Sequence, residues 1–473
     1  MTRDEYLSQD AVGLAALIAA HEVSASEVLE AAIARLAEVN PKLNAVTLDL
    51  SERARRQVAS QAPSGPLGGV PFLLKDLGPQ LAGTPTTASC RLYKDDVAAA
   101  DTPLAAAYQK GGLVIFGKTN TPEIGLEPIT EPVMFGPTRN PWDLSRTSGG
   151  SSGGAAAATA AGITPAAHAS DGGGSIRIPA SACGLFGLKP SRGRISSAPR
   201  DEGWGGFSCN HVVSRSVRDS ALLLDIACAP EPGDPYWLDP PARPFAEEAA
   251  GPPGVLRVAF TTAAMASDGL DPECAEAVRS AARLCESLGH RVEEATIPGS
   301  VRGAIAAAGV VVSSSVAADF DTIAKRRGRP IGEDEVEPLT WSTYQRGRGV
   351  DASTYLKALR ITHAFGRDMA AFHQRYDVLI TSTLGKPAIP IGELHGEPLD
   401  QHGYAQRLFA FMPNTQAFNL TGQPAASIPL AMSSGGLPIG VQFSARQAEE
   451  ALLFRLAAQL EQAQPWASRR PPL

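Results

Sequence analysis

Apolar positions near the start of the chain recur with a helical period. Residues 11–20 and 24–40 carry apolar side chains at three- and four-residue intervals, which predicts two amphipathic helices. Ser24 and Glu27 form the capping-box pattern at the start of the second helix. Because proline interrupts helical hydrogen bonding, we expect this helix to end before Pro41.

A strand–helix–strand pattern follows. Residues 69–74 and 113–117 are short, continuous apolar runs typical of buried strands. Between them, residues 102–112 have a helical pattern, with Pro103 at the first position and Gly111 at the C-terminal cap. This order predicts two parallel strands joined by a helical crossover.

Helical and strand patterns of apolar residues are also found in the second half of the chain. Six elements are expected there: strands at 255–260, 291–297, 376–382 and 436–443, and helices at 271–290 and 449–463. Eight prolines lie within residues 230–254, and we interpret this stretch as a surface excursion rather than a domain boundary. We therefore expect one domain spanning residues 1–473.

Residues 135–200 differ in composition, because Gly, Ser and Ala dominate and charges are few. A helix at 155–162 and an apolar stretch at 163–169 separate two loops, "SGGSSGG" (148–154) and "DGGGSIR" (171–177). The stretch is too rich in Ala, Ile and Leu for a flexible linker.

Charge and cysteine content exclude several classes of function. The 473 residues have a net charge of −7 without a basic run, which argues against nucleic-acid and anionic-membrane partners. The six cysteines include no CxxC pair and no zinc-site spacing, so we expect a reduced, cytoplasmic setting and no metal. The first ten residues are too polar for a secretory signal, and the most apolar run, 303–312, is too short to span a bilayer.

Lys75 directly follows an apolar strand, which places its amine near the core. Burial disfavours the charged form and lowers a lysine pKa, and a neutral amine is a general base. Two alternatives stay open from the residues alone. Lys75 could pair with a carboxylate such as Asp76, or extend to the surface at the strand end.

Ser151 lies in a GxSxG pattern formed with Gly149 and Gly153. The nucleophile elbow of an α/β-hydrolase has this pattern, but an elbow follows a strand directly, and we do not expect "NPWDLSRTSGG" to be a strand. An esterase of this type would also need a later histidine, for which the candidates are His211, His290, His363, His373, His395 and His402. A phosphate loop is not supported, since no GKS or GKT follows.

Gly172, Gly173 and Gly174 precede Ser175. Consecutive glycines let backbone N–H groups converge on one point, as an oxyanion hole beside an acylated serine requires. The alternative is a glycine-rich turn before a helix that contains Pro179.

Lys75, Ser151 and Ser175 together resemble the amidase signature family. The similar segments are "PFLLKD", "GKTNTPE", "TRNPWDLSRTSGGSSGGAAAA", "SDGGGSIRIPASACGLFGLKPSRGRIS", "FNLTGQPAASIPL" and "GLPIGVQ". Within the family, they are most similar to bacterial amidases of the 6-aminohexanoate cyclic dimer hydrolase type. The match is dense over residues 65–200 and weak over 200–410, the region expected to shape the substrate pocket. The resemblance implies an α/β fold: an α/β/α sandwich with a large mixed central β-sheet covered by helices.

The resemblance also implies roles for the reactive residues. Ser175 would be the nucleophile, Ser151 the bridging serine that follows a cis peptide bond, and Lys75 the base. The N–H groups of Gly172, Gly173, Gly174 and Ser175 would form the oxyanion hole, and the reaction would need no metal or cofactor. Most family members carry a larger residue at the position of Gly172, which leaves the acyl preference open.

Neighbouring residues are expected to have supporting roles. Asp171 would accept N–H groups of the loop, Arg177 would form a buried ion pair, and Ser152 would hold the loop by hydrogen bonding. His168 is expected to be a core residue. Trp204 and Phe207 could line an acyl pocket or pack in the core, and these alternatives are equally weighted.

The resulting prediction is an amidase that cleaves C–N bonds of small uncharged amides, extending to aryl esters, carbamates or urethanes, and nylon-type oligomers. Three alternatives remain: the glutaminase subunit of a tRNA-dependent amidotransferase, a Ser-His-Asp esterase using Ser151, and an inactive binding protein. The partner would be a small-molecule amide, and a homodimer is expected only by family resemblance.

Overall fold

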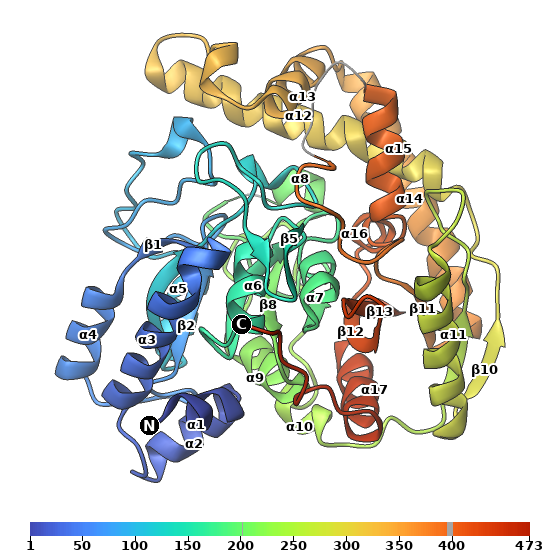
Figure 1. The fold of residues 1–473 in the computed structure, drawn as a ribbon. Helices are drawn as coiled ribbons and strands as arrows, with labels where there is room; N and C mark the ends of the chain where they lie inside the picture. Colours follow the sequence, from blue (N-terminus) through green and yellow to red (C-terminus); the bar gives the residue numbers. More distant parts are fainter. Residues whose placement is uncertain (201, 395–400) are drawn as a thin grey trace.

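An eleven-stranded mixed β-sheet runs through the molecule, with helices on both faces (Figure 1). The structure is a computed structural model that describes residues 1–200, 202–394 and 401–473. The strand order is β1-β3-β2-β6-β8-β7-β12-β13-β11-β9-β10. The bounds of these strands are β1 Val46–Asp49, β2 Pro71–Lys75, β3 Val114–Thr119, β6 Ala166–Asp171, β7 Phe186–Lys189, β8 Cys209–Ser214, β9 Arg257–Phe260, β10 Arg291–Glu294, β11 Val378–Ser382, β12 Ala425–Met432 and β13 Pro438–Ala445.

The helices are distributed along the whole chain. Their bounds are α1 Arg3–Ser8, α2 Ala11–Ala19, α3 Ala25–Leu43, α4 Ser51–Ser60, α5 Pro103–Lys110, α6 Gly153–Ala160, α7 Arg177–Cys183, α8 Gly203–Gly206, α9 Val217–Ala227, α10 Phe245–Ala249, α11 Pro272–Ser287, α12 Val301–Arg327, α13 Pro338–Arg348, α14 Ala352–Arg375, α15 Gln401–Phe411, α16 Gln416–Thr421 and α17 Glu450–Ala463.

Both predicted strand–helix–strand units are present. β2 and β3 pair in parallel across α5, and β9 and β10 pair in parallel across α11. β6 is also parallel to β2, whereas the strands from β6 to β11 are linked by antiparallel pairs. The proline-rich stretch 230–254 connects α9 to β9, and the strands on both sides of it belong to the same sheet.

Two adjacent residues of β7 show that the sheet is covered on both faces. Phe186 packs on Phe454 of α17, with ring centroids 6.2 Å apart. A Cβ on Gly187 would lie 2.6 Å from the Cβ of Ala180 in α7. Because successive residues of a strand face opposite sides, α7 and α17 cover opposite faces. α6 packs beside α7, and α9 and α10 pack beside α17, so the predicted α/β/α sandwich is confirmed.

α12, α13 and α15 lie along one end of the molecule, at the top of Figure 1. α12 is long and apolar enough to cross a membrane, and half of its apolar window is buried within the fold. It packs against α13, α14 and α16. Buried core helices share this length and composition, so the feature by itself does not indicate a membrane protein.

The expected end of the second helix is wrong. α3 continues through Pro41 to Leu43 and ends at Asn44, which adopts a left-handed conformation and donates its N–H to the Asn40 carbonyl. The Asn40 side chain also accepts the N–H groups of Ala45 and Val46, both at 2.9 Å. These two asparagines hold the final turn together despite the missing N–H of the proline.

The segment before Ser151 also differs from the expectation. β5 (Asp143–Thr147) is a strand, paired with β4 (Arg139–Asn140) in a separate two-stranded sheet. Its outer edge contacts a segment that is distant in sequence, since Thr147 donates its N–H to the Ile389 carbonyl at 2.9 Å. Because four of the five residues of 143–147 are polar, the local pattern did not indicate the strand.

Replacing Ser24 with alanine should destabilise the protein by about 1 kcal/mol, because the Ser24 hydroxyl accepts the Glu27 N–H and caps α3. Urea unfolding of the wild type and the variant measures the difference. Ser26→Ala, at an exposed position in the same first turn, should change the stability by less than about 0.5 kcal/mol. Equal effects of the two substitutions would contradict the capping role.

Candidate active site

Lys75 ends β2, a strand whose five residues are all buried. Its Nζ donates hydrogen bonds to Ser151 Oγ at 2.6 Å and to Ser170 Oγ at 3.0 Å. Burial lowers the Lys75 pKa from 10.5 to about 7, against the opposing influence of the Asp171 carboxylate. This corresponds to a penalty of about 5 kcal/mol on the charged amine. Asp76 does not pair with Lys75 and instead accepts hydrogen bonds from the Thr87 N–H and hydroxyl.

Ser151 is held against Lys75 by its own loop. The Gly150–Ser151 peptide bond is cis, as the resemblance implied. A side chain on Gly150 would place its Cβ 2.4 Å from the Ile129 carbonyl oxygen, so this position needs glycine. The Ser151 side chain is almost fully buried, and the next residue, Ser152, donates its N–H to the Ser175 carbonyl at 3.3 Å. The two serine loops are therefore in direct contact.

Ser175 follows the triple glycine and lies on the wall of a cavity. Gly174 has φ +135°, a conformation that side chains rarely permit. A Cβ there would lie 2.4 Å from Thr415 Oγ1. The triple glycine is thus a tightly packed turn as well as a candidate oxyanion loop.

An ion pair fixes the loop around Ser175. Asp171, at the end of β6, accepts the N–H groups of Gly174 at 2.7 Å and Ile176 at 3.2 Å. Arg177 donates to both carboxylate oxygens of Asp171, at 2.8 and 2.9 Å, and both side chains are fully buried. Burial raises the Asp171 pKa, but the charge and hydrogen bonds of Arg177 outweigh it and hold the pKa at about 2. The loop hydrogen bonds and the ion pair expected of these residues are present.

The hydrogen bond from Gly174 bears on the expected oxyanion hole. Its N–H already points at the Asp171 carboxylate. The expectation that Gly174 also donates to an oxyanion is therefore not supported by this geometry. Its role in the loop is to shape the backbone before Ser175.

Two further residues stabilise the site from β6. The Ser152 hydroxyl accepts the Ser170 N–H and donates to the Ser170 carbonyl, both at 3.2 Å. His168 Nδ1 accepts a hydrogen bond from the backbone N–H of Lys75 at 3.3 Å. Burial lowers the His168 pKa to about 3. Ser152 thus has the loop contact expected of it, and His168 is the core residue that was predicted.

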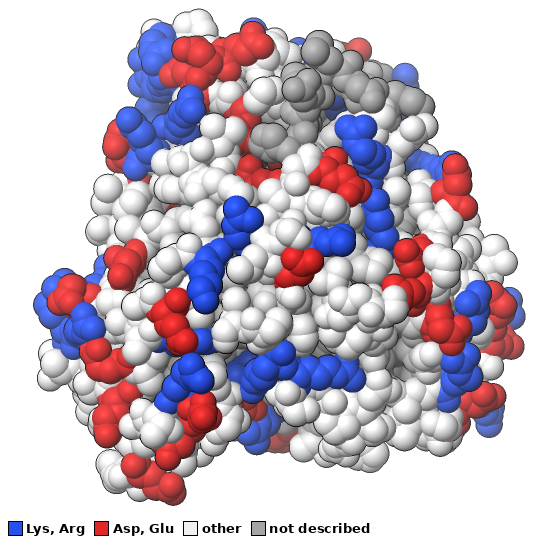
Figure 2. All heavy atoms as spheres, in the orientation of Figure 1, with Lys and Arg blue, Asp and Glu red and all other residues white. Residues whose placement is uncertain are grey.

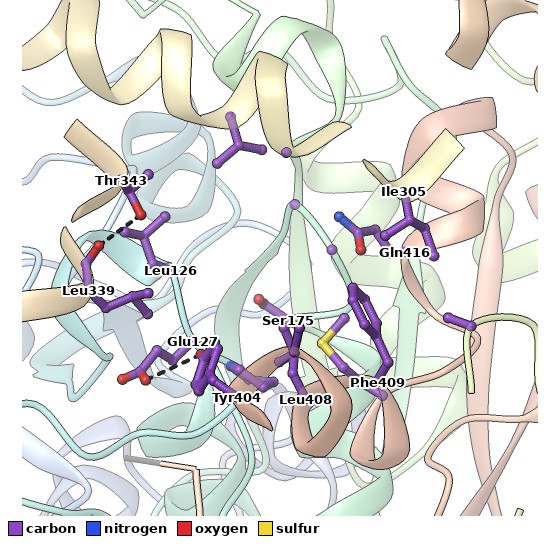
Figure 3. Close-up of a pocket in the computed structure, with 18 of the residues that line it drawn as sticks. Leu126, Glu127, Ser175, Ile305, Leu339, Thr343, Tyr404, Leu408, Phe409 and Gln416 are labelled. Atoms are coloured by element: carbon purple, nitrogen blue, oxygen red, sulfur yellow. Dashed lines mark hydrogen bonds between the residues drawn. The ribbon is translucent and has the colours of Figure 1, made fainter. Parts of the chain in front are cut away.

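A cavity of about 640 Å³ opens in front of Ser175. Its walls come from the Ser175 loop and from α12, α13, α15 and α16, whose side chains surround Ser175 in Figure 3. The lining is mostly apolar and includes Leu126, Ile305, Leu408 and Phe409. Such a site accommodates a small, largely apolar molecule.

Trp204 and Phe207 have different roles. Trp204 lines the cavity, whereas Phe207 is 3% exposed and packs in a core cluster with residues of α12 and α14. A Cβ on Gly172 would lie 2.7 Å from the Trp204 ring. The indole therefore takes up space beside Gly172 that a larger side chain at this position would need.

Three of the candidate histidines have polar partners other than Ser151. His211 contacts Ser220 at 2.8 Å, His290 contacts Gln459 at 2.8 Å, and His373 contacts the Tyr376 carbonyl at 3.2 Å. His363 is exposed on α14. His395 and the side chain of His402 lie outside the described residues. Ser151 Oγ interacts with Lys75, which gives the esterase alternative no support.

Sequence reasoning missed several residues of this site. Ser170 contacts the Lys75 amine, and the parallel pairing of β2 with β6 could have indicated that both strands end at this edge. Thr415 and Asn419 were also missed. Thr415 Oγ1 donates to the Gly173 carbonyl at 2.8 Å, and Asn419 Nδ2 donates to Asp171 Oδ1 at 2.8 Å. The only sequence signal for Asn419 was its position in the segment "FNLTG".

Comparisons with known proteins place most of the chain in one family. Residues 27–454 match the family Amidase. The 6-aminohexanoate-cyclic-dimer hydrolase of Paenarthrobacter ureafaciens is 40% identical, over 99% of this chain and 97% of that protein. The acylamidase of Rhodococcus erythropolis is 33% identical, over 100% of this chain and 98% of that protein. The solved structure of 6-aminohexanoate cyclic dimer hydrolase has a TM-score of 0.92 at 39% identity, over 98% of this chain and 99% of that one.

The chain therefore belongs to the amidase family. It is an enzyme that hydrolyses amide C–N bonds. The resemblance stated from the sequence motifs, including that to the cyclic dimer hydrolase type, is confirmed.

Replacing Arg177 with methionine should destabilise the protein by about 3–5 kcal/mol, because it leaves the Asp171 carboxylate buried without its counter-ion. Thermal and urea unfolding measure the loss. Arg446→Met, which removes a half-exposed partner of Asp377, is the matched control and should cost less than about 1 kcal/mol. A similar small loss in both variants would show that the buried pair does not stabilise the loop.

Proposed function

We propose that the protein hydrolyses small amides through an acyl-enzyme on Ser175, with Ser151 and Lys75 as the proton relay. The observation that carries this proposal is the 2.6 Å hydrogen bond between Lys75 Nζ and Ser151 Oγ, next to a cavity lined by Ser175. A buried amine with a pKa of about 7 is substantially neutral at physiological pH, as a general base must be.

The first half of the reaction forms the acyl-enzyme. Lys75 accepts the proton of Ser151, Ser151 accepts the proton of Ser175, and Ser175 Oγ attacks the amide carbonyl carbon. The C–N bond then breaks, and the relay returns the proton to the leaving nitrogen. In the second half, water gives a proton to the relay and attacks the acyl carbon, which releases the acid and restores Ser175.

Backbone N–H groups of Gly172, Gly173 and Ser175 are proposed to stabilise the tetrahedral oxyanion. We exclude Gly174 from this set, because its N–H binds Asp171. The Asp171–Arg177 pair is proposed to hold the loop in place before substrate arrives, so that the donors need no reorganisation during the reaction.

The relatives support an amide substrate over the alternatives. They are named as a hydrolase of a cyclic amide dimer and as an acylamidase. We propose that this chain accepts small amides, with aryl esters, carbamates and nylon-type oligomers as further candidates. Lys75, Ser151 and Ser175 are all present, which argues against an inactive binding protein, and nothing described favours a glutaminase subunit.

We propose a small-molecule amide as the partner of this protein and the cytoplasm as its location. The surface shown in Figure 2 carries interspersed acidic and basic side chains, which gives no reason to invoke a nucleic-acid partner. All six cysteines are free thiols, in keeping with a reducing cytoplasm. The homodimer stays a prediction from family resemblance.

The pH dependence of kcat/KM should follow the titration of Lys75. Because only the neutral amine accepts a proton, activity should fall about tenfold per pH unit below about pH 7 and level off above it. Initial rates on an uncharged anilide between pH 5.5 and 9 test this. A flat profile over that range would contradict Lys75 as the base.

A fluorophosphonate should label Ser175, which peptide mass spectrometry can verify. Ser175→Ala should abolish labelling and turnover, and Lys75→Met and Ser151→Ala should each lower kcat by at least about 100-fold. Lys118→Met is the matched control, because Lys118 is also a buried strand lysine but binds the Thr86 hydroxyl instead. An adduct on Ser151, or near-normal turnover of Lys75→Met, would refute the relay. Turnover of an amide by the purified chain alone would also distinguish this protein from a glutaminase subunit.

A further inference from the structure

Glu127 is a buried acid on the wall of the substrate cavity. The residue is 6% exposed, and the mechanism above does not use it. Its Oε1 accepts a hydrogen bond from the Tyr404 hydroxyl at 3.5 Å, which is at the outer limit for such a bond. Figure 3 shows the pair on one side of Ser175, with Gln416 and Ile305 on the other.

Three neighbouring carboxyls are bound more firmly. Glu123, Glu131 and Glu337 each accept a backbone N–H, at 2.7, 2.8 and 2.7 Å respectively. None of the three lines the cavity, whereas Glu127 does. Among the described residues, Glu127 has this one long hydrogen bond, and a buried acid held so weakly is costly unless something else binds it.

Glu127 is also close to the reacting groups. Gly125, two residues earlier, lies against Ser151, since a Cβ on Gly125 would be 3.3 Å from Ser151 Oγ. Two residues span at most about 7 Å of chain. The wall that carries Glu127 is therefore continuous with the segment that contacts the relay.

The charges around Glu127 favour a cation at this position. Burial first, and then the carboxyls of Glu337 and Glu131, raise the Glu127 pKa to about 8. A bound cation would offset both effects. Among the described residues, the basic side chains that line the cavity are those of Arg302 and Arg346. Both are exposed, and Arg302 pairs with Asp268 at 2.6 Å.

We propose that Glu127 determines substrate specificity by binding a protonated amine of the substrate. The preferred substrates would then be amides that carry an ammonium group a few carbon atoms from the scissile bond, rather than the uncharged amides expected from the sequence. This inference rests on the proposed acyl-enzyme function of the same cavity. Tyr404 assists by donating to the same carboxyl.

The test compares paired substrates. One set contains ω-aminoacyl 4-nitroanilides of four to eight carbons with their alkanoyl and ω-carboxyacyl counterparts, and a second set places the amine on the leaving side of the amide. In at least one set, the wild type should prefer the amine-bearing substrate over the methyl-terminated one by at least tenfold in kcat/KM. Glu127→Gln should reduce that preference below threefold, through a loss of kcat/KM on the amine-bearing substrate.

Glu131→Gln is the matched control, because Glu131 belongs to the same carboxyl cluster but does not line the cavity. It should keep the wild-type preference. The inference is overturned if the wild type shows no preference for the amine, if it prefers the carboxylate, or if the preference survives in Glu127→Gln. Hydrolysis of methyl-terminated anilides without any amine preference would leave the acyl-enzyme proposal intact, whereas no hydrolysis of any substrate would refute the acyl-enzyme proposal itself.

Inhibition of the wild type keeps the inference testable even if Glu127→Gln does not fold. Hexylammonium should inhibit at a concentration at least tenfold lower than hexanol does. Equal inhibition by the two compounds would overturn the inference.

Discussion

The contact between the buried Lys75 amine and the Ser151 hydroxyl is the constraint on which the proposed proton relay depends. Lys75 is fully buried at the end of β2, and its Nζ lies 2.6 Å from Ser151 Oγ. Water at this position would restore the ordinary basicity of lysine and remove the base at neutral pH. Under the proposed mechanism, the burial of the whole strand, and of the sheet edge around it, is therefore a catalytic requirement as well as a source of stability.

The second requirement of the proposed mechanism is a rigid loop around Ser175. Glycine at position 174 permits the turn, and the Asp171–Arg177 pair fixes it by binding the loop N–H groups. Arg177 in turn donates to the Thr415 carbonyl and to Gln442, which belong to the C-terminal part of the fold. The loop geometry thus depends on contacts between segments 238 and 265 residues apart, and a local sequence cannot specify them.

Much of this arrangement could be predicted, because several segments have a local sequence pattern that indicates their structure. The apolar run before Lys75 indicated a buried strand, the triple glycine indicated a close backbone approach, and the motifs around Ser151 and Ser175 indicated the family. Features created by distant partners could not be predicted. The division of roles between Trp204 and Phe207 depends on how α12 and α14 pack.

The cavity walls and the reacting groups come from different parts of the chain. Lys75, Ser151 and Ser175 lie in the first 200 residues, whereas much of the lining comes from α12, α13 and α15. Changes in those helices can therefore alter which molecules enter while the chemistry stays intact. A library of variants confined to the cavity-facing positions of these three helices would explore new substrates with little risk to turnover, which makes this architecture a favourable starting point for directed evolution.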